Sequence, residues 1–198
     1  MAQRLTRLLA VLAACAALAA CSHKVQWRTD NIDGLMPTLD FHMTDDSGKT
    51  VTAQTYHGKI VLLYFGYTNC PDVCPTTLAK LAQALKNTKN HGTGIQVLFV
   101  TVDPKRDSVS RMHEYVRAFG PWFVGLVGTQ DELRTLTKRY RVTYSYGKPG
   151  ADGNYEVTHS SAVFVFDGSG RSRLIMVPHD SADAITADLD QLAGQSGS

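Results

Sequence analysis

The chain has little cysteine, no excess of charge of either sign and no internal repeat. Four cysteines among 198 residues are too few for a small scaffold held together by disulfides. The 20 basic and 18 acidic side chains leave no basic stripe for a nucleic acid or an anionic membrane surface. The longest apolar run, residues 8–20, is shorter than the roughly 20 residues of a membrane-spanning helix. The sequence therefore predicts neither nucleic-acid binding nor a disulfide-rich scaffold.

The amino terminus has the pattern of an export signal. Arg4 and Arg7 precede the apolar run, whose length is typical of a signal-peptide core. The run ends in Leu-Ala-Ala before Cys21, which resembles the lipobox of bacterial lipoproteins, where cleavage precedes a cysteine that becomes lipidated. An ordinary secretory signal with a chance cysteine is the alternative. We expect an exported protein that a lipid on Cys21 anchors to a bacterial membrane, facing the periplasm.

This interpretation divides the chain into three segments. Residues 1–20 are the predicted signal peptide, 21–36 a lipidated tether and 37–198 one folded domain. The tether is assigned because residues 22–36 are polar and irregular. Cys15 would be removed with the signal peptide, which leaves Cys70 and Cys74 for chemistry in an oxidising compartment.

The domain has the pattern of an α/β fold. Residues 59–66 and 95–102 are continuous apolar runs, typical of parallel strands that are buried on both faces. Strands that alternate with helices, followed by a hairpin, indicate a thioredoxin-like fold with a mainly parallel central sheet, flanking helices and an added β-hairpin. The other expected elements are an entry hairpin (39–43, 51–56), helices (75–86, 108–119, 131–140, 182–192), a strand (123–127), a loop or loose hairpin (144–155) and a terminal hairpin (162–166, 172–177).

Cys70 and Cys74 lie where an open α/β sheet places its ligands, in a loop between the carboxyl end of a strand and a helix. The positive end of the helix dipole favours a thiolate over a thiol, so we expect at least one cysteine to ionise more easily than free cysteine. Three intervening residues leave room for an ion between the sulfurs. A thiolate can attack a disulfide or bind a metal, and the spacing alone permits both.

A histidine is the natural third ligand for two thiolates. Soft thiolates favour Cu(I), and an added imidazole also accommodates Cu(II), whereas structural zinc normally has four protein ligands. Among the seven histidines, His159 stands out because it leads directly into the strand predicted at 162–166. A simple hydrogen-bonded histidine is the alternative. Asp72, between the cysteines, and Asp103, at the end of a strand, could orient the ligands, or could serve only as turn residues.

Three segments resemble the signatures of the Sco/SenC family: residues 65–78, 100–107 and 158–160. Their order matches, and His159 follows Cys74 by 85 positions, a separation similar to the family's. The resemblance covers roughly residues 39–192. It implies a thioredoxin-like fold and copper bound by Cys70, Cys74 and His159. It also implies a role at the dinuclear copper centre of cytochrome c oxidase, either delivering copper or reducing the cysteines of that centre.

Two functions compete on these residues. A metallochaperone, which is not an enzyme, would bind Cu(I) or Cu(II) and pass it to the copper-receiving subunit of cytochrome c oxidase. A thiol-disulfide oxidoreductase would use Cys70 and Cys74 as its redox pair and keep the cysteines of the oxidase or of other exported proteins reduced. Other copper chaperones or thiol-disulfide reductants are further candidate partners. We favour the chaperone, because a distant histidine is needed for copper and is dispensable for disulfide exchange.

Overall fold

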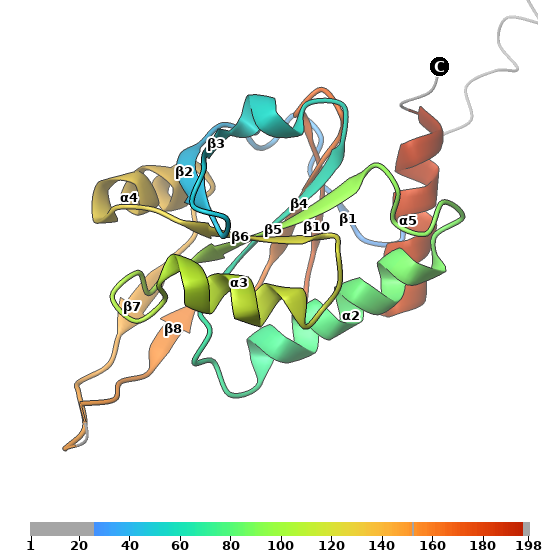
Figure 1. Ribbon diagram of the computed structural model, residues 1–198. Coiled ribbons are helices and arrows are strands. Elements are labelled where there is room, and N and C mark those ends of the chain that lie inside the picture. Colours follow the sequence, from blue (N-terminus) through green and yellow to red (C-terminus); the bar gives the residue numbers. More distant parts are fainter. Residues whose placement is uncertain (1–25, 152, 196–198) are drawn as a thin grey trace, which may run out of the picture.

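The centre of the sheet is built from the two continuous apolar segments. β4 (Ile60–Gly66) and β5 (Ile95–Thr101) are buried at every residue and pair in parallel. β6 (Phe123–Val127) pairs in parallel with the other edge of β5. The computed structural model describes residues 26–151 and 153–195 (Figure 1). The signal peptide and Cys21 lie outside the described residues.

The outer strands turn this centre into a mixed sheet. Eight strands are arranged in the order β1-β10-β9-β4-β5-β6-β2-β3. Among the described strands, only the pairs β4–β5 and β5–β6 are parallel, because β2–β3 and β9–β10 return as hairpins. The predicted α/β, thioredoxin-like fold is confirmed, but the sheet is parallel only at its centre. The outer strands are β1 (Asp30–Asn31), β2 (His42–Asp45), β3 (Thr50–Thr52), β9 (Val163–Phe166) and β10 (Ser172–Met176).

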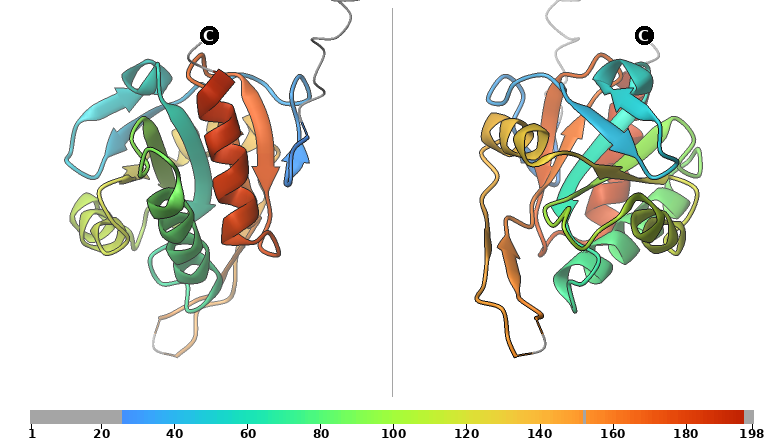
Figure 2. Two further views of the ribbon diagram at one scale, coloured as in Figure 1. Left: turned by 90° about the vertical axis from the view of Figure 1, so that its right-hand side faces the viewer. Right: turned by 60° about the vertical axis from the view of Figure 1, so that its left-hand side comes forward.

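Helices cover both faces of the sheet (Figures 1 and 2). The crossovers from β4 to β5 and from β5 to β6 place α2 and α3 on one face, where α5 packs against α2 (Figure 1). α4 covers the other face, and its C-cap residue Tyr140 packs against Phe164 and Phe166. The helices are α2 (Val73–Asn87), α3 (Val109–Arg117), α4 (Gln130–Arg139) and α5 (Ala182–Gln195), and a 3-10 turn (Ala53–Tyr56) follows β3.

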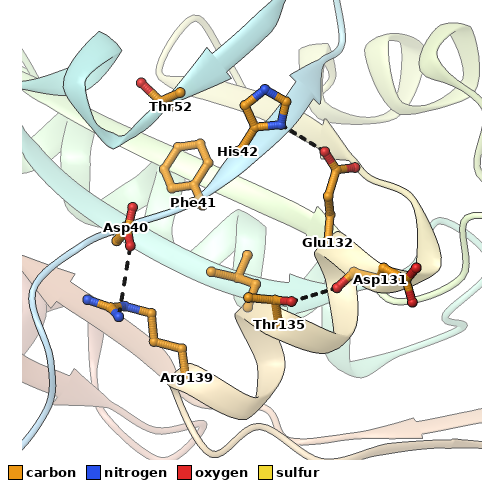
Figure 3. Close-up of a pocket in the computed structure, with 9 residues that line it drawn as sticks. Asp40, Phe41, His42, Thr52, Asp131, Glu132, Thr135 and Arg139 are labelled. Carbon is orange, nitrogen blue, oxygen red and sulfur yellow. Dashed lines mark hydrogen bonds and ion pairs between the residues drawn. The ribbon is translucent and has the colours of Figure 1, made fainter.

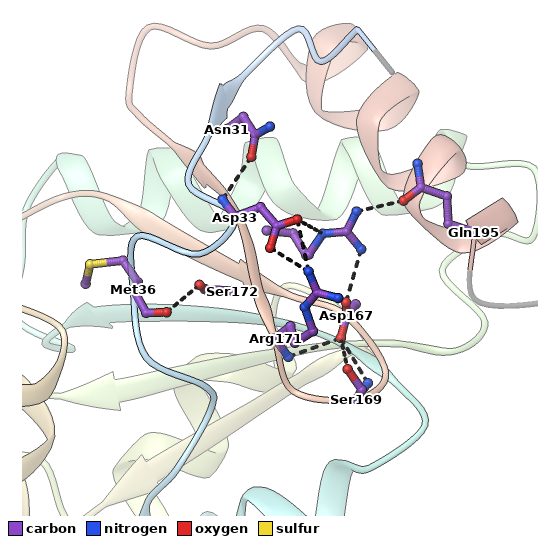
Figure 4. Close-up of polar contacts among 9 residues, drawn as sticks. Asn31, Asp33, Met36, Asp167, Ser169, Arg171, Ser172 and Gln195 are labelled. Carbon is purple, nitrogen blue, oxygen red and sulfur yellow. Dashed lines mark hydrogen bonds and ion pairs between the residues drawn. The ribbon is translucent and has the colours of Figure 1, made fainter. Parts of the chain in front are cut away.

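The segment before residue 37 is part of the domain. β1 pairs with β10, and the buried carboxylate of Asp188 accepts hydrogen bonds from the Arg28 and Thr29 backbone N–H groups and from the Thr29 hydroxyl. Asp33 forms ion pairs with Arg171 and Arg173 (Figure 4). The predicted tether over 21–36 is therefore too long at its carboxyl end. Its polar composition resembles a linker, but the domain uses those polar groups as hydrogen-bond and ion-pair partners.

A two-stranded ribbon projects from the edge of the domain (Figure 2). β7 (Tyr144–Tyr146) pairs antiparallel with β8 (Val157–His159), and this pair forms a sheet of its own. The prediction of a loop or loose hairpin over 144–155 corresponds to this ribbon. In the described part of the chain, no helix is both long and apolar enough to span a bilayer.

Candidate metal centre

The end of β4 places two cysteines close together. The chain leaves the sheet at Gly66, and α2 begins at Val73, so Cys74 lies in the first helical turn and Cys70 in the preceding loop. Cys74 is fully buried and Cys70 is half-buried. An added Cβ at Gly66 would lie 2.7 Å from the Cys74 sulfur and 2.6 Å from the Phe99 ring. Glycine at this position therefore lets the strand pass close to the buried sulfur.

His159 approaches the cysteines from the ribbon. It is the last residue of β8, and its Nε2 atom lies 3.3 Å from the Cys74 sulfur. Its Nδ1 atom lies 3.0 Å from the Ser160 carbonyl oxygen, which can only accept a hydrogen bond. Nδ1 is therefore the protonated nitrogen of the neutral ring, and the Nε2 lone pair faces the sulfur. This is the tautomer that a metal-binding histidine needs.

The three predicted ligand residues form one group. The two sulfurs and one imidazole nitrogen all lie within 4.8 Å of one another. Among the residues that the structure describes, no other set of three His, Cys, Asp or Glu side chains meets this condition. Residues separated by 85 positions are thus brought together at the carboxyl end of β4. The arrangement can hold a soft cation or, without one, can bring two thiols into reach of each other.

Burial dominates the electrostatics of the group. Desolvation raises the pKa of the Cys74 thiol to about 12, although a hydrogen bond from the Tyr67 backbone opposes this shift. Burial also lowers the pKa of His159. Cys74 is therefore not the cysteine that the expectation of easier ionisation requires, because desolvation is the largest influence on its thiol. A cation that replaces the thiol proton would remove the cost of a buried, unpaired thiolate.

The group opens onto a cleft of about 440 Å³, lined on one side by the cysteine loop and on the other by β8. The Tyr67 ring stands edge-on to the His159 ring, with 5.9 Å between the ring centroids. Because Cys70 lines this cleft and Cys74 is buried behind it, Cys70 is the sulfur that a partner reaches first.

Asp72 and Asp103 lie outside the three-residue group. Asp72 is exposed at the start of α2 and accepts a weak hydrogen bond from the Thr76 hydroxyl, at 3.3 Å. Asp103 is fully buried and accepts hydrogen bonds from the Tyr155 hydroxyl, at 2.7 Å, and from the Arg106 guanidinium. Asp103 thereby ties the ribbon that carries His159 to the end of β5.

Asp107, Thr68 and Arg111 hold the cysteine loop, a role that the sequence did not predict for any of them. The buried carboxylate of Asp107 accepts hydrogen bonds from the Thr68 backbone N–H, at 3.0 Å, and from the Thr68 hydroxyl, at 2.6 Å. The Arg111 guanidinium donates to the same hydroxyl, at 2.8 Å. In sequence, Asp107 resembles a surface residue, because it lies in a polar stretch before a helix. Its position within the family signature at 100–107 was the one sequence feature that marked it.

A larger cleft of about 550 Å³ lies elsewhere, between β2 and α4 (Figure 3). Four of its charged side chains are paired with one another. His42 lies 2.8 Å from Glu132, and Arg139 lies 3.9 Å from Asp40. No cysteine lines this cleft, so the chemistry favours the smaller one.

Comparison with known proteins identifies the family. Residues 31–194 match the model of the SCO1/SenC family. The chain belongs to this family. Protein SCO1 homolog 1, a mitochondrial protein of Arabidopsis thaliana, is 41% identical over 126 residues, which are 63% of this chain and 37% of that protein. An SCO2-like protein of Rickettsia conorii is 35% identical over 134 residues, 67% of this chain and 65% of that protein.

Solved structures of SCO1/SenC relatives have the same fold. The crystal structure of Arabidopsis thaliana ScoI with copper bound has a TM-score of 0.73 and 34% identity, covering 80% of this chain and 98% of that chain. The crystal structure of yeast Sco1 with copper bound has a TM-score of 0.72 and 33% identity, covering 80% of this chain and 90% of that chain. The chain spans 37% and 65% of the lengths of the two relatives above.

Proposed function

We propose that this chain binds one copper ion through Cys70, Cys74 and His159 and supplies it for assembly of the dinuclear copper centre of cytochrome c oxidase. The observation that carries the proposal is the grouping of two sulfurs and one imidazole nitrogen within 4.8 Å of one another. Two thiolates and an imidazole suit Cu(I) and accommodate Cu(II), whereas structural zinc normally takes four protein ligands. The Arabidopsis thaliana and yeast relatives were solved with copper bound, which supports the same ion here.

The copper is cargo in this proposal, and the protein's residues control its entry and exit. Cys74 forms the buried side of the site, whereas Cys70 and His159 are both half-buried and line the cleft. A partner ligand, such as a cysteine of the copper-receiving oxidase subunit, would therefore reach the ion from the Cys70 side. Transfer by stepwise ligand exchange needs one accessible protein ligand, and of the two sulfurs Cys70 has that position.

The test is a copper titration of the reduced protein from Ser22 onward. Cu(I) affinity is measured by competition with a chromophoric chelator, and Cu(II) binding by the sulfur-to-copper charge-transfer absorption. We expect one ion per chain, with binding strongly weakened in His159→Ala. His42→Ala is the matched control, because His42 is exposed and paired with Glu132 in the other cleft. Equal copper binding by the parent and His159→Ala would overturn the three-ligand site.

A second candidate function rests on the unequal exposure of the two thiols. In a thiol-disulfide oxidoreductase, the Cys70 thiolate would attack a partner disulfide and release one partner thiol. Cys74 would then attack the mixed disulfide, releasing the second partner thiol and leaving a Cys70–Cys74 disulfide. The half-buried Cys70 and buried Cys74 suit these two roles. Full disulfide reductase activity in His159→Ala, together with weak copper binding by the parent, would favour this function.

We further propose that a lipid on Cys21 holds the protein at a bacterial membrane, facing the periplasm. The lipobox-like sequence before Cys21 supports this location. In cells fed a labelled fatty acid, the parent should carry the label and sediment with membranes. Cys21→Ser should lose both properties, and an unlabelled parent would contradict the anchor.

A further inference from the structure

Cys70 occupies the least regular position of the three proposed ligands. Cys74 lies inside α2, and His159 lies at the end of β8, whereas Cys70 lies in the loop between β4 and α2. Its own backbone N–H donates to the Tyr67 carbonyl at 3.2 Å, within the same loop. The Cys70 sulfur accepts one hydrogen bond from the start of α2, from the Cys74 backbone N–H at 3.4 Å, and its position otherwise depends on what holds this loop against the rest of the domain.

A buried carboxylate supplies that attachment. Asp107 is fully buried, and its two oxygens receive three hydrogen bonds. Two come from the backbone N–H and the hydroxyl of Thr68, two residues before Cys70, and the third comes from the Thr101 hydroxyl at the end of β5, at 2.6 Å. Hydrogen bonds to an ionised acceptor are stronger than neutral ones, so this contact fixes the loop to the central sheet.

Arg111 holds the same loop from the solvent side. Its Nε donates to the Thr68 hydroxyl oxygen, and its Nη2 donates to the Asn69 side-chain oxygen. The Thr68 hydroxyl therefore donates its single proton to Asp107 and accepts a hydrogen bond from Arg111 through one oxygen lone pair. Two opposite charges thus clamp one hydroxyl, and the clamp ends one residue before Cys70.

We propose that Asp107, acting through Thr68, is a positioning residue that holds the Cys70 sulfur at the distance needed to share one ion with Cys74 and His159. The inference rests on the proposed copper site. Groups that orient metal ligands without touching the metal typically change metal affinity by about 10- to 100-fold when they are removed. We expect a loss of this size, because the loop would have to be ordered again when the ion binds.

Asp107→Asn is the direct test, and the chain offers a matched control. Asp188 is also a buried carboxylate that accepts from the backbone N–H and the hydroxyl of one threonine, Thr29, but it holds the amino-terminal segment. We expect Asp107→Asn to lower Cu(I) affinity about 10- to 100-fold and to change the charge-transfer spectrum of the Cu(II) form. Asp188→Asn should lower the thermal midpoint and leave both copper readouts unchanged.

Thr68 variants keep the test decisive if Asp107→Asn does not fold. Thr68→Val removes the clamped hydroxyl at nearly constant volume, and Thr68→Ser retains it. We expect copper affinity to fall in the valine variant and to stay near the parent's value in the serine variant. Parent-like affinity and spectrum in Thr68→Val would overturn the proposal, as would equal losses in the valine and serine variants.

A measurement without copper separates this inference from the proposed function. In the reduced apo-protein, hydrogen exchange at the Thr68 amide and alkylation of Cys70 should both be faster in Asp107→Asn than in Asp188→Asn. If the parent fails to bind copper but these rates differ as expected, the copper function is wrong and the positioning role stands. Unchanged rates would refute the positioning role whatever the parent binds.

Discussion

Replacing Gly66 by alanine should damage both stability and the metal site. A Cβ there would lie 2.6 Å from the Phe99 ring and 2.7 Å from the Cys74 sulfur, both closer than non-bonded atoms approach. Neither neighbour can move easily, because both side chains are fully buried. Overpacking of this kind costs about 1–3 kcal/mol. Loss of glycine flexibility in the unfolded chain offsets about 0.4–1 kcal/mol of that cost.

The net expectation is a destabilisation centred on about 1.3 kcal/mol, within a range of roughly 0–2.6 kcal/mol. For a domain of this size, each kcal/mol corresponds to a fall of roughly 2–4 °C in the thermal midpoint. Urea unfolding followed by tryptophan fluorescence measures the free energy directly. Because the displaced sulfur belongs to a proposed ligand, copper affinity should fall in the same variant.

Gly194→Ala is the control for this experiment. Gly194 lies in α5, and a Cβ added there would meet nothing within 4 Å. Alanine suits a helix better than glycine, so this variant should be as stable as the parent or slightly more stable. If Gly66→Ala were also as stable as the parent and bound copper equally well, the close packing of β4 against the Cys74 sulfur would not matter for the site.

Three other outcomes follow from the same structure. Iodoacetamide at mildly alkaline pH should modify Cys70 well before Cys74, because Cys74 is buried and its pKa is raised to about 12. Mass spectrometry of the peptides that carry each cysteine measures the two rates, and equal rates would contradict this prediction. Asp188→Ala should cost about 1–3 kcal/mol and speed hydrogen exchange in residues 28–32, since three donors would lose a buried acceptor. Hydrogen bonds from the Thr129 backbone and then from His42 lower the pKa of Glu132 in the folded protein. The ionised Glu132 therefore stabilises the folded state above the ordinary carboxyl pKa, and this contribution is lost as the pH falls through the lowered pKa of the folded state. Glu132→Gln should therefore flatten the acid limb of stability against pH, and an unchanged limb would contradict this assignment.

The sequence predicted best where apolar residues run without interruption. The runs at 59–66 and 95–102 became β4 and β5 within one residue at each end, and the strand at 123–127 was placed correctly. Such segments can be predicted because a strand that is buried on both faces needs apolar side chains at nearly every position. Outer strands are harder, since β1 is only two polar residues long and exists because β10 provides partners for its backbone, while Asp188 holds the two residues before it.

The site shows the same division between local pattern and distant contact. Cys70 and Cys74 were marked by spacing and position, and His159 by its place in the chain together with the family resemblance. The raised pKa of Cys74 could not be predicted, because it depends on how deeply the sulfur is covered rather than on the helix start beside it. Asp107 was missed for a related reason: its partner Thr68 lies 39 positions earlier in the chain.

The difference in burial between the two sulfurs links the two candidate functions. A buried thiol with a raised pKa is a poor nucleophile, so Cys74 alone would neither attack a partner disulfide nor ionise readily. A bound soft cation compensates the buried charge, whereas disulfide formation with Cys70 removes the charge altogether. Copper binding and disulfide formation consume the same two thiolates, so one chain cannot do both at once. The oxidation state of Cys70 and Cys74 should therefore decide whether the chain can bind copper, and reduction of the pair should come before copper loading.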